Sequence, residues 1–288
     1  MQNLRIGTCS WKYPSWHGLV YSRPDGIDYL EEYARQYDTV EIDQWFWSLF
    51  SGGKIRLPDS REAESYRNAV PSNFRFTVKA PNSITLTHSY SREKKKPGSP
   101  NPHFLSAKLA SAFLDSISPL HDVLGPVILQ FEYLNREKMA SQEAFEKSLR
   151  TFRPFLPGGF EFGIEIRNPN YLNDRLFGFL QDNEFLPVLL EGYWMPPVAV
   201  VHEKHGERLK KFKVLVLRLH GKDRESIEGE TGKEWNRIVR PADAELTRLA
   251  GVISDWLDSG LQVYVNVNNH FEGSAPLTIR RLLERLPK

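Results

Sequence analysis

Cysteine is almost absent from this chain, because Cys9 is the only one among its 288 residues. An intramolecular disulfide is therefore excluded, and a reducing compartment is the simplest expectation. Long apolar runs are missing as well, and the opening residues MQNLRIGTCSW are typical of neither a signal peptide nor a transmembrane helix. We therefore expect a cytoplasmic protein with no membrane partner.

Neither sign of charge dominates, since 38 lysines and arginines face 36 aspartates and glutamates and leave a net charge of +2. The bulk charge gives no electrostatic footprint for nucleic acid or an acidic membrane, although a local basic patch stays open. The glycines form no GxGxxG and no Walker-type loop. No nucleotide-cofactor motif is therefore present, and the cofactor is left unknown.

Short apolar runs alternate with longer amphipathic stretches along the whole chain. Strands are expected at Leu4–Cys9, Thr39–Asp43, Phe74–Lys79, Pro126–Phe131, Glu161–Ile166, Leu186–Leu190, Val214–Leu219 and Gln262–Val267. Helical spacing between them, as in Leu246, Leu249 and Ile253, indicates parallel strands with helical crossovers. The sequence thus predicts one α/β domain over residues 1–288, a (β/α)8 TIM barrel with a closed, parallel, eight-stranded sheet and a site at its C-terminal mouth.

Two longer segments interrupt this rhythm, at about residues 81–103 and 221–240. Both follow strands, so both are expected to lie over the mouth of the barrel. The first contains the charged run Arg92–Lys96, and the second is rich in charge and glycine. Such loops are either lids and binding loops or solvated, mobile surface, and the sequence leaves both open.

Alternation within the strands separates an apolar face from a charged one. Leu215, Leu217 and Leu219 share one face of their strand, and Arg218 and His220 share the other. The other strands behave in the same way, so the polar faces are expected to point into the barrel. Buried charge is costly unless it is paired. Either a functional site or an internal salt-bridge network would explain charged side chains inside the barrel.

Seven segments of the chain are familiar as a set. They read GTCSWKYPSWHG, TVEIDQWFWSLF, FRFTVKAPNSITLTH, LGPVILQFEYLN, EIRNPNYL, LRLHG and VYVNVNNHFEG, in this order. In them the chain resembles the YecE-like family, known as domain of unknown function 72, a resemblance that implies a TIM barrel and no established activity. The chain departs from the usual family pattern at three places near the mouth, namely Asp43-Gln44, Phe131-Glu132-Tyr133 and Val267-Asn268-Asn269.

Glu41, Glu165 and His220 are the candidate catalytic residues, because carboxylates and an imidazole at a mouth could act as acid and base. The alternative is that neighbouring cations neutralise the two carboxylates, which would lower their pKa values and make them poor acids. We expect ion pairing in the resting protein, without excluding a role with substrate.

A second set of residues is expected to hold a polar, anionic ligand. Lysine and arginine side chains would bind its charge, amides would orient it, and tryptophans would stack on it or instead anchor the rim loops. The candidates are Trp11, Trp45, Lys79, His88, Gln130, Arg167, Arg218, Asn266, Asn268 and Asn269. Lys79 is expected either to bind an anion or to pair with Glu41. Further aromatics follow strand ends, at Tyr13, Trp16, Phe46, Trp47, Tyr133, Tyr193, Trp194 and Phe271.

A metal site is not favoured. His88, His220 and His270 could hold a divalent ion together with Glu41 and Glu165, but no HExxH or similar ligand spacing supports this. No metal ligands are assigned. A reactive thiolate needs a cationic neighbour or a helix N-terminus, and an arginine or lysine near Cys9 stays open. A lone buried cysteine is nevertheless usually inert, and we expect this of Cys9.

Three functions are therefore open. The leading prediction is an enzyme acting on a small polar anionic molecule, a sugar or nucleotide derivative. A metal-dependent nucleic-acid-processing protein would use the aromatic rim and the Arg92–Lys96 run. A non-catalytic binding or partner protein would show mouth charges that are mutually paired and closed to solvent. The oligomeric state is not indicated.

Overall fold

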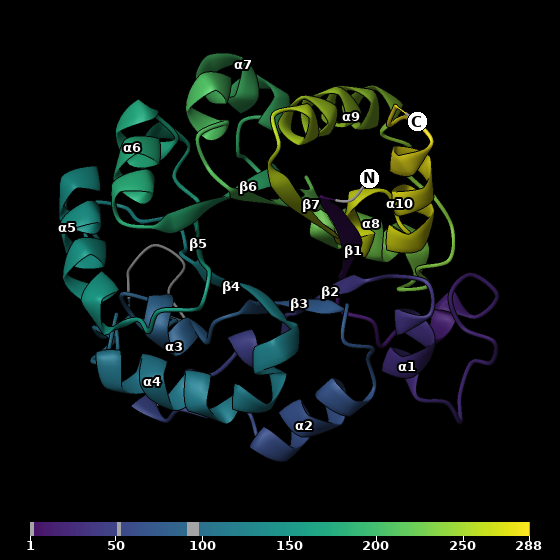
Figure 1. The fold of residues 1–288 in the computed structure, drawn as a ribbon, viewed down its shortest axis with the longest axis horizontal. Helices are drawn as coiled ribbons and strands as arrows, with labels where there is room; N and C mark the ends of the chain where they lie inside the picture. Colours follow the sequence, from purple (N-terminus) through teal and green to yellow (C-terminus); the bar gives the residue numbers. More distant parts are fainter. Residues whose placement is uncertain (1–2, 51–52, 91–97, 288) are drawn as a thin grey trace.

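Eight parallel strands close into a ring in the order in which they occur along the chain. The computed structural model describes residues 3–50, 53–90 and 98–287. Each strand pairs with its sequence neighbour, and β1 pairs with β8 to complete the circle. Helices surround this ring on the outside (Figure 1). The predicted (β/α)8 TIM barrel is thus confirmed.

The strands are β1 (Leu4–Cys9), β2 (Thr39–Ile42), β3 (Arg75–Lys79), β4 (Leu124–Gln130), β5 (Phe162–Glu165), β6 (Phe185–Gly192), β7 (Val214–Gly221) and β8 (Gln262–Val267). All eight lie where the sequence predicts a strand, with ends that move by up to two residues. The largest extensions at the C-terminal end are in β6 and β7, because Gly192 pairs with Gly221 beyond a register shift.

The helices are α1 (Tyr29–Ala34), α2 (Ser60–Asn68), α3 (Asn82–Thr85), α4 (Ala107–Ser116), α5 (Gln142–Phe152), α6 (Asp174–Asp182), α7 (Val198–Leu209), α8 (Arg224–Thr231), α9 (Asp243–Asp258) and α10 (Ala275–Leu283). Side chains cap several N-termini, as the oxygen of Ser141 does by accepting from the Ala144 amide. None of the described helices is long and apolar enough to cross a membrane.

The outer and inner faces of the sheet contact two separate apolar clusters. Leu215, Leu217 and Leu219 of β7 belong to the large cluster between the sheet and the helices. A small cluster fills the barrel and contains Ile128, Val188, Val214, Val216 and Tyr264. Val214 and Val216 share their face of β7 with Arg218 and His220. The apolar side chains therefore fill the barrel near the N-terminal ends of the strands, and the interior near their C-terminal ends is polar.

Both long segments contain short helices and follow the C-terminal ends of their strands. Helix α3 begins the segment after β3, and α8 lies in the segment after β7. Trp235, beyond α8, is buried and packs edge-on against His270, and its amide donates to the Ser15 hydroxyl oxygen, 3.1 Å away. The second segment is thus joined to the loops after β1 and β8. The charged run Arg92–Lys96 lies outside the described residues.

Candidate functional site

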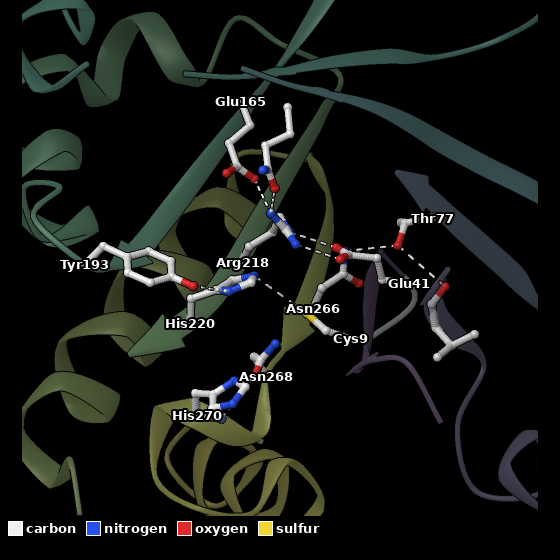
Figure 2. A network of polar contacts seen from close by, with 12 residues as sticks. Cys9, Glu41, Thr77, Glu165, Tyr193, Arg218, His220, Asn266, Asn268 and His270 are labelled. Carbon is white, nitrogen blue, oxygen red and sulfur yellow. Dashed lines mark hydrogen bonds and ion pairs between the residues drawn. The ribbon is translucent and has the colours of Figure 1, made fainter. Parts of the chain in front are cut away.

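Arg218 of β7 lies at the centre of the polar mouth. Its guanidinium donates to both carboxylate oxygens of Glu41 on β2, from Nε at 2.8 Å and from Nη2 at 2.6 Å. The remaining nitrogen, Nη1, contacts the Glu165 carboxylate and donates to the Gln130 amide oxygen at 3.0 Å. One side chain therefore joins β7 to β2, β4 and β5, none of which is adjacent to β7 in the ring (Figure 2).

Burial makes these contacts strong, because Arg218, Glu41 and Glu165 are almost completely shielded from solvent. Glu165 has a second cationic partner, since the Nε of Arg167 donates to its other oxygen at 2.6 Å. Burial alone would raise the pKa of Glu165, but Arg167 and Arg218 outweigh it and lower the pKa to about 2. The ion pairing expected from the sequence is confirmed.

Asn266 of β8 completes the environment of Glu41. Its amide nitrogen donates to Glu41 at 3.1 Å and to the hydroxyl of Thr77 at 3.0 Å. The amide oxygen of Asn266 is buried and has no hydrogen-bond partner among the described residues. An acceptor without a donor is costly inside a protein, so this oxygen is a natural contact for a ligand or a water molecule.

Lys79 of β3 is a buried cation without a contacting counter-ion. Its side chain is only 8% exposed, and it makes no ion pair within 4.0 Å among the described residues. The ammonium instead lies 3.9 Å from the centroid of the Phe46 ring, in a cation–π contact. Burial and the charge of Arg218 lower its pKa from 10.5 to about 8, against the opposing effect of Glu41 and other carboxylates. The expected pair between Lys79 and Glu41 does not form, because Arg218 and Asn266 occupy the Glu41 oxygens.

His220 ends the polar face of β7 and is flanked by Cys9 and Tyr193 (Figure 2). Its Nε2 lies 3.9 Å from the Cys9 sulfur, and its Nδ1 lies 3.5 Å from the Tyr193 hydroxyl. Burial and the cations Arg218 and Arg167 lower the pKa of His220 well below 6.5, so the imidazole is neutral at pH 7. The neutral imidazole has a free lone pair, but burial and the nearby cations make it a weak base in the unliganded protein.

Cys9 is not prepared for nucleophilic attack in this arrangement. Burial and the carboxylate of Glu41 raise the pKa of its thiol well above the usual value, despite the opposing charge of Arg218. The thiol form therefore dominates at neutral pH, and the thiolate is the reactive form. This agrees with the expectation of an inert buried cysteine.

Tyr193 follows β6 in a strained backbone conformation. It has a φ of 51°, in the left-handed region that bulky residues avoid. Its amide donates to the carbonyl of Gly221 at 2.8 Å, which anchors the turn to the end of β7. The Tyr193 ring is thereby placed beside His220, and the guanidinium carbon of Arg167 lies over the ring, 4.8 Å from the ring centroid. Backbone strain of this kind is retained where the surrounding structure demands one side-chain position.

The two candidate tryptophans both pack against Tyr66 from α2. Trp11 is 1% exposed and meets the Tyr66 ring edge-on at 5.0 Å, whereas Trp45 is 7% exposed and stacks on it at 5.7 Å. The indole nitrogen of Trp45 donates to Glu62 at 2.8 Å. Both rings therefore anchor the rim loops in this conformation, which is one of the two roles that the sequence left open.

The remaining candidates lie at the edge of the mouth and are engaged by their own loops. The Asn269 side-chain oxygen accepts from the Ala275 amide at 2.8 Å, and the Asn268 side-chain oxygen accepts from the His270 amide at 3.0 Å. The His88 ring has Thr87 as its only hydrogen-bond partner in the described parts of the chain. These three side chains bond to their own loops rather than to the Arg218 network, so their roles as ligand contacts stay predictions.

No group of three or more histidine, cysteine, aspartate or glutamate side chains within the described ranges is arranged to hold a metal ion. His88, His220 and His270 therefore do not share such a group there. His270 is used by the rim itself, because its Nε2 lies 3.0 Å from a carboxylate oxygen of Glu228 on α8.

Three further residues matter to the site, and the sequence had named two of them, Phe46 and Tyr193, only as aromatics that follow strand ends. Thr77 holds Asn266, Phe46 covers Lys79, and Tyr193 contacts both Arg167 and His220. Thr77 shares its strand face with Lys79, so alternation could have found it. Phe46 and Tyr193 lie in loops, where alternation gives no orientation.

The geometry defines a TIM-barrel protein with a buried, charged site at the C-terminal end of its strands, the end at which barrel enzymes carry their active sites. Fold alone does not fix a reaction. The chain belongs to the family described as "Protein of unknown function DUF72", which it matches over residues 5–288.

Individual relatives agree with this assignment. The chain is 29% identical over 168 residues to the UPF0759 protein YecE of Escherichia coli (strain K12), an alignment that covers 58% of this chain and 49% of that protein. The match thus spans about half the length of this curated relative.

Solved structures of two DUF72 family proteins share the fold. The protein from Enterococcus faecalis V583 has a TM-score of 0.68 and 19% identity, with 98% of this chain and 95% of that chain covered. The protein from Thermotoga maritima MSB8 has a TM-score of 0.66 and 20% identity, with 98% of each chain covered. At these identities the likeness supports the barrel and carries no information on substrate.

Proposed function

We propose that the mouth of this barrel binds a small polar molecule through an anionic group, a sugar or nucleotide derivative, and acts on it as an enzyme. The observation that carries the proposal is Lys79. A buried ammonium is expensive unless an opposite charge meets it, and none within 4.0 Å does so in the described residues. An anionic ligand would supply the missing partner and would also restore the pKa of Lys79 upward.

The other groups fit the same ligand. The buried oxygen of Asn266 lacks a donor, which a hydroxyl of the ligand could provide. Arg167, at the edge of the network, retains donors beyond the one it gives to Glu165. A site with few, well-placed polar groups is typical of small-molecule recognition.

His220 is the strongest candidate for general base among the three catalytic candidates. It is 8% exposed, and its two ring nitrogens have only long contacts. Burial and the cations that lower its pKa oppose protonation in the unliganded protein, and an anionic ligand beside Arg167 and Arg218 would offset those charges and raise the pKa. Glu165 carries two cationic partners and is ionised at neutral pH, so it is unsuited to donate a proton. In this proposal Glu41 and Glu165 hold the Arg218 guanidinium in position at the centre of the mouth.

A binding experiment tests the anion site. Isothermal titration with inorganic phosphate should show binding to the wild type and a loss of at least about tenfold in affinity for Lys79→Met. Lys222→Met is the matched control, because Lys222 is a largely exposed lysine whose ammonium has a carboxylate oxygen of Glu245 at 3.9 Å. Equal affinity of the wild type and Lys79→Met would contradict the proposal.

Catalysis is tested separately. Turnover of a panel of sugar phosphates and nucleotides, followed by NMR, should disappear in His220→Ala while ligand binding persists. If Glu165→Gln and His220→Ala both leave binding and turnover unchanged, the enzyme proposal is wrong.

A non-catalytic binding protein is the second candidate, and the closed network favours it. Glu41, Glu165, Arg167 and Arg218 are mutually paired and nearly shielded from water. Lys79-dependent binding without any turnover in the panel would support this candidate. Nucleic-acid binding rests on the aromatic rim and on Arg92–Lys96, and it stays a prediction to be tested by the salt dependence of binding to single-stranded DNA or RNA.

A further inference from the structure

A pocket of about 600 Å³ lies beside the mouth, between the loop after β2 and the start of α2. This volume is within the range of small-molecule sites. Three aromatic side chains line it, those of Trp45, Trp47 and Phe50, together with the polar groups Gln44, Arg56, Asp59 and Glu62. None of these groups belongs to the Arg218 network, so the pocket is separate from the site already described.

Two of the aromatic walls are open to solvent. Trp47 is 62% exposed and Phe50 is 50% exposed, although side chains of this size usually bury most of their surface. Trp47 also contacts Tyr90 from the segment after β3, with 5.8 Å between ring centroids. The exposed indole therefore has a defined neighbour as well as a free surface facing the pocket.

Stacking and hydrogen bonds hold one wall of the pocket in place. Trp45 stacks on Tyr66, and Glu62 accepts from the Trp45 indole at 2.8 Å and from the Tyr66 hydroxyl at 2.7 Å. Both carboxylate oxygens of Glu62 are thus used by the wall itself. A ligand entering the pocket would find a preorganised surface, which lowers the entropy cost of binding.

One strong donor in the pocket is left available. The Asp59 carboxylate is held by the side chain and amide of Arg61, at 2.9 Å in each case. The Arg56 guanidinium makes no hydrogen bond or ion pair with any residue that the structure describes. Arginine offers five N–H donors in a plane, which suits the hydroxyl groups of a sugar ring or a carboxylate.

Phe46 contacts both a wall of this pocket and the Lys79 ammonium of the mouth. The centroid of the Phe46 ring lies 3.9 Å from the Lys79 ammonium and 5.1 Å from the centroid of the Trp47 ring, which it meets edge-on. A ligand with an anionic group at Lys79 and a ring against Trp47 would therefore span two adjacent features of the same rim.

We propose that this pocket is a sugar subsite, in which a saccharide ring lies against Trp47 with its hydroxyls on Arg56 while its phosphate or carboxylate reaches Lys79. The inference rests on the proposed function, because it places the anionic group at the mouth. It narrows the substrate class to anionic saccharides. An apolar ring face and a rim of hydroxyls match an exposed indole beside a planar multiple donor.

Isothermal titration tests this with six named probes: inorganic phosphate, adenosine 5′-monophosphate and the 6-phosphates of glucose, mannose, galactose and glucosamine. At least one sugar phosphate should bind about tenfold more tightly than inorganic phosphate. Trp47→Ala should reduce that advantage to about twofold or less, without weakening inorganic phosphate. Phe155→Ala is the control, because Phe155 is equally exposed but lies after α5, away from this pocket.

The inference is wrong if no sugar phosphate exceeds inorganic phosphate, or if the advantage survives Trp47→Ala. It is also wrong if adenosine 5′-monophosphate alone shows a Trp47-dependent advantage, since the ring would then be a nucleobase. In these cases Lys79-dependent phosphate binding would remain, and the proposed function would stand. Absence of binding for every probe, inorganic phosphate included, would overturn both.

Discussion

Replacement of Glu41 by glutamine removes one charge from the most buried ion pair of the mouth. The variant keeps the shape of the side chain but leaves Arg218 with Glu165 as its only carboxylate partner in the described parts of the chain. Removing one partner of a buried pair costs about 3–5 kcal/mol, because the other charge stays desolvated. Natural proteins are stable by only about 5–15 kcal/mol, so this is a large fraction of the total.

Urea denaturation measures the effect directly, since the free energy of unfolding extrapolates linearly with denaturant. Glu31→Gln is the matched control: Glu31 pairs with Arg35 at 2.7 Å on the surface of the protein, with both side chains more than half exposed. That pair should contribute less than about 0.5 kcal/mol. A double-mutant cycle of Glu41→Gln with Arg218→Met should show a coupling of about 1–3 kcal/mol.

The reasoning fails if Glu41→Gln lies within about 1 kcal/mol of the wild type while remaining folded. That result would mean that water reaches the network in the native protein. The pair would then behave like one on the surface.

Three further outcomes follow from the same structure. The pKa of Lys79 is about 8 in the folded chain and 10.5 for an unperturbed lysine, so the unfolded chain binds more protons between pH 8 and pH 10.5. The free energy of unfolding should therefore rise by roughly 3 kcal/mol as the pH increases across this interval. Urea titrations at several pH values should show this rise in the wild type and not in Lys79→Met. Folding lowers the pKa of Glu165 from 4.5 to about 2, so its ionised form stabilises the folded chain. This should contribute roughly 3 kcal/mol to the free energy of unfolding above pH 4.5, and the contribution should decline as the pH falls towards 2. It should be missing in Glu165→Gln. Gly192→Ala would place a Cβ 2.3 Å from the Gly221 carbonyl oxygen at a φ of 140°, so it should lower the thermal midpoint, whereas Gly251→Ala in the middle of α9, where nothing lies within 4 Å, should raise it or leave it unchanged.

The alternation of strand residues was sufficient to place the polar network. Arg218, Glu41 and Glu165 each occupy the inward face that the sequence assigned, because side-chain direction in a strand depends only on position. Their partners were harder to predict. Lys79 and Arg218 both point at the mouth, and only the three-dimensional arrangement shows that Arg218 takes both oxygens of Glu41.

Loop residues were beyond this kind of reasoning. The burial of Trp11 depends on Tyr66 from a helix that follows the next strand, so no local pattern signals it. The ends of β6 and β7 were missed for a related reason, since pairing of Gly192 with Gly221 extends both strands through a residue type that is uncommon in strands.

The central position of Arg218 also bears on how the chain folds. Its partners Glu41 and Glu165 lie 177 and 53 positions earlier in the sequence, and Asn266 reaches Glu41 across 225 positions. Contacts this distant form slowly, because the loop entropy must be lost before they stabilise anything. We therefore expect the charges of Glu41 and Arg218 to remain hydrated while the first strands assemble, and to lose their water when the ring closes. Dehydration of the network is thus expected to accompany the last step of folding rather than to guide the early ones.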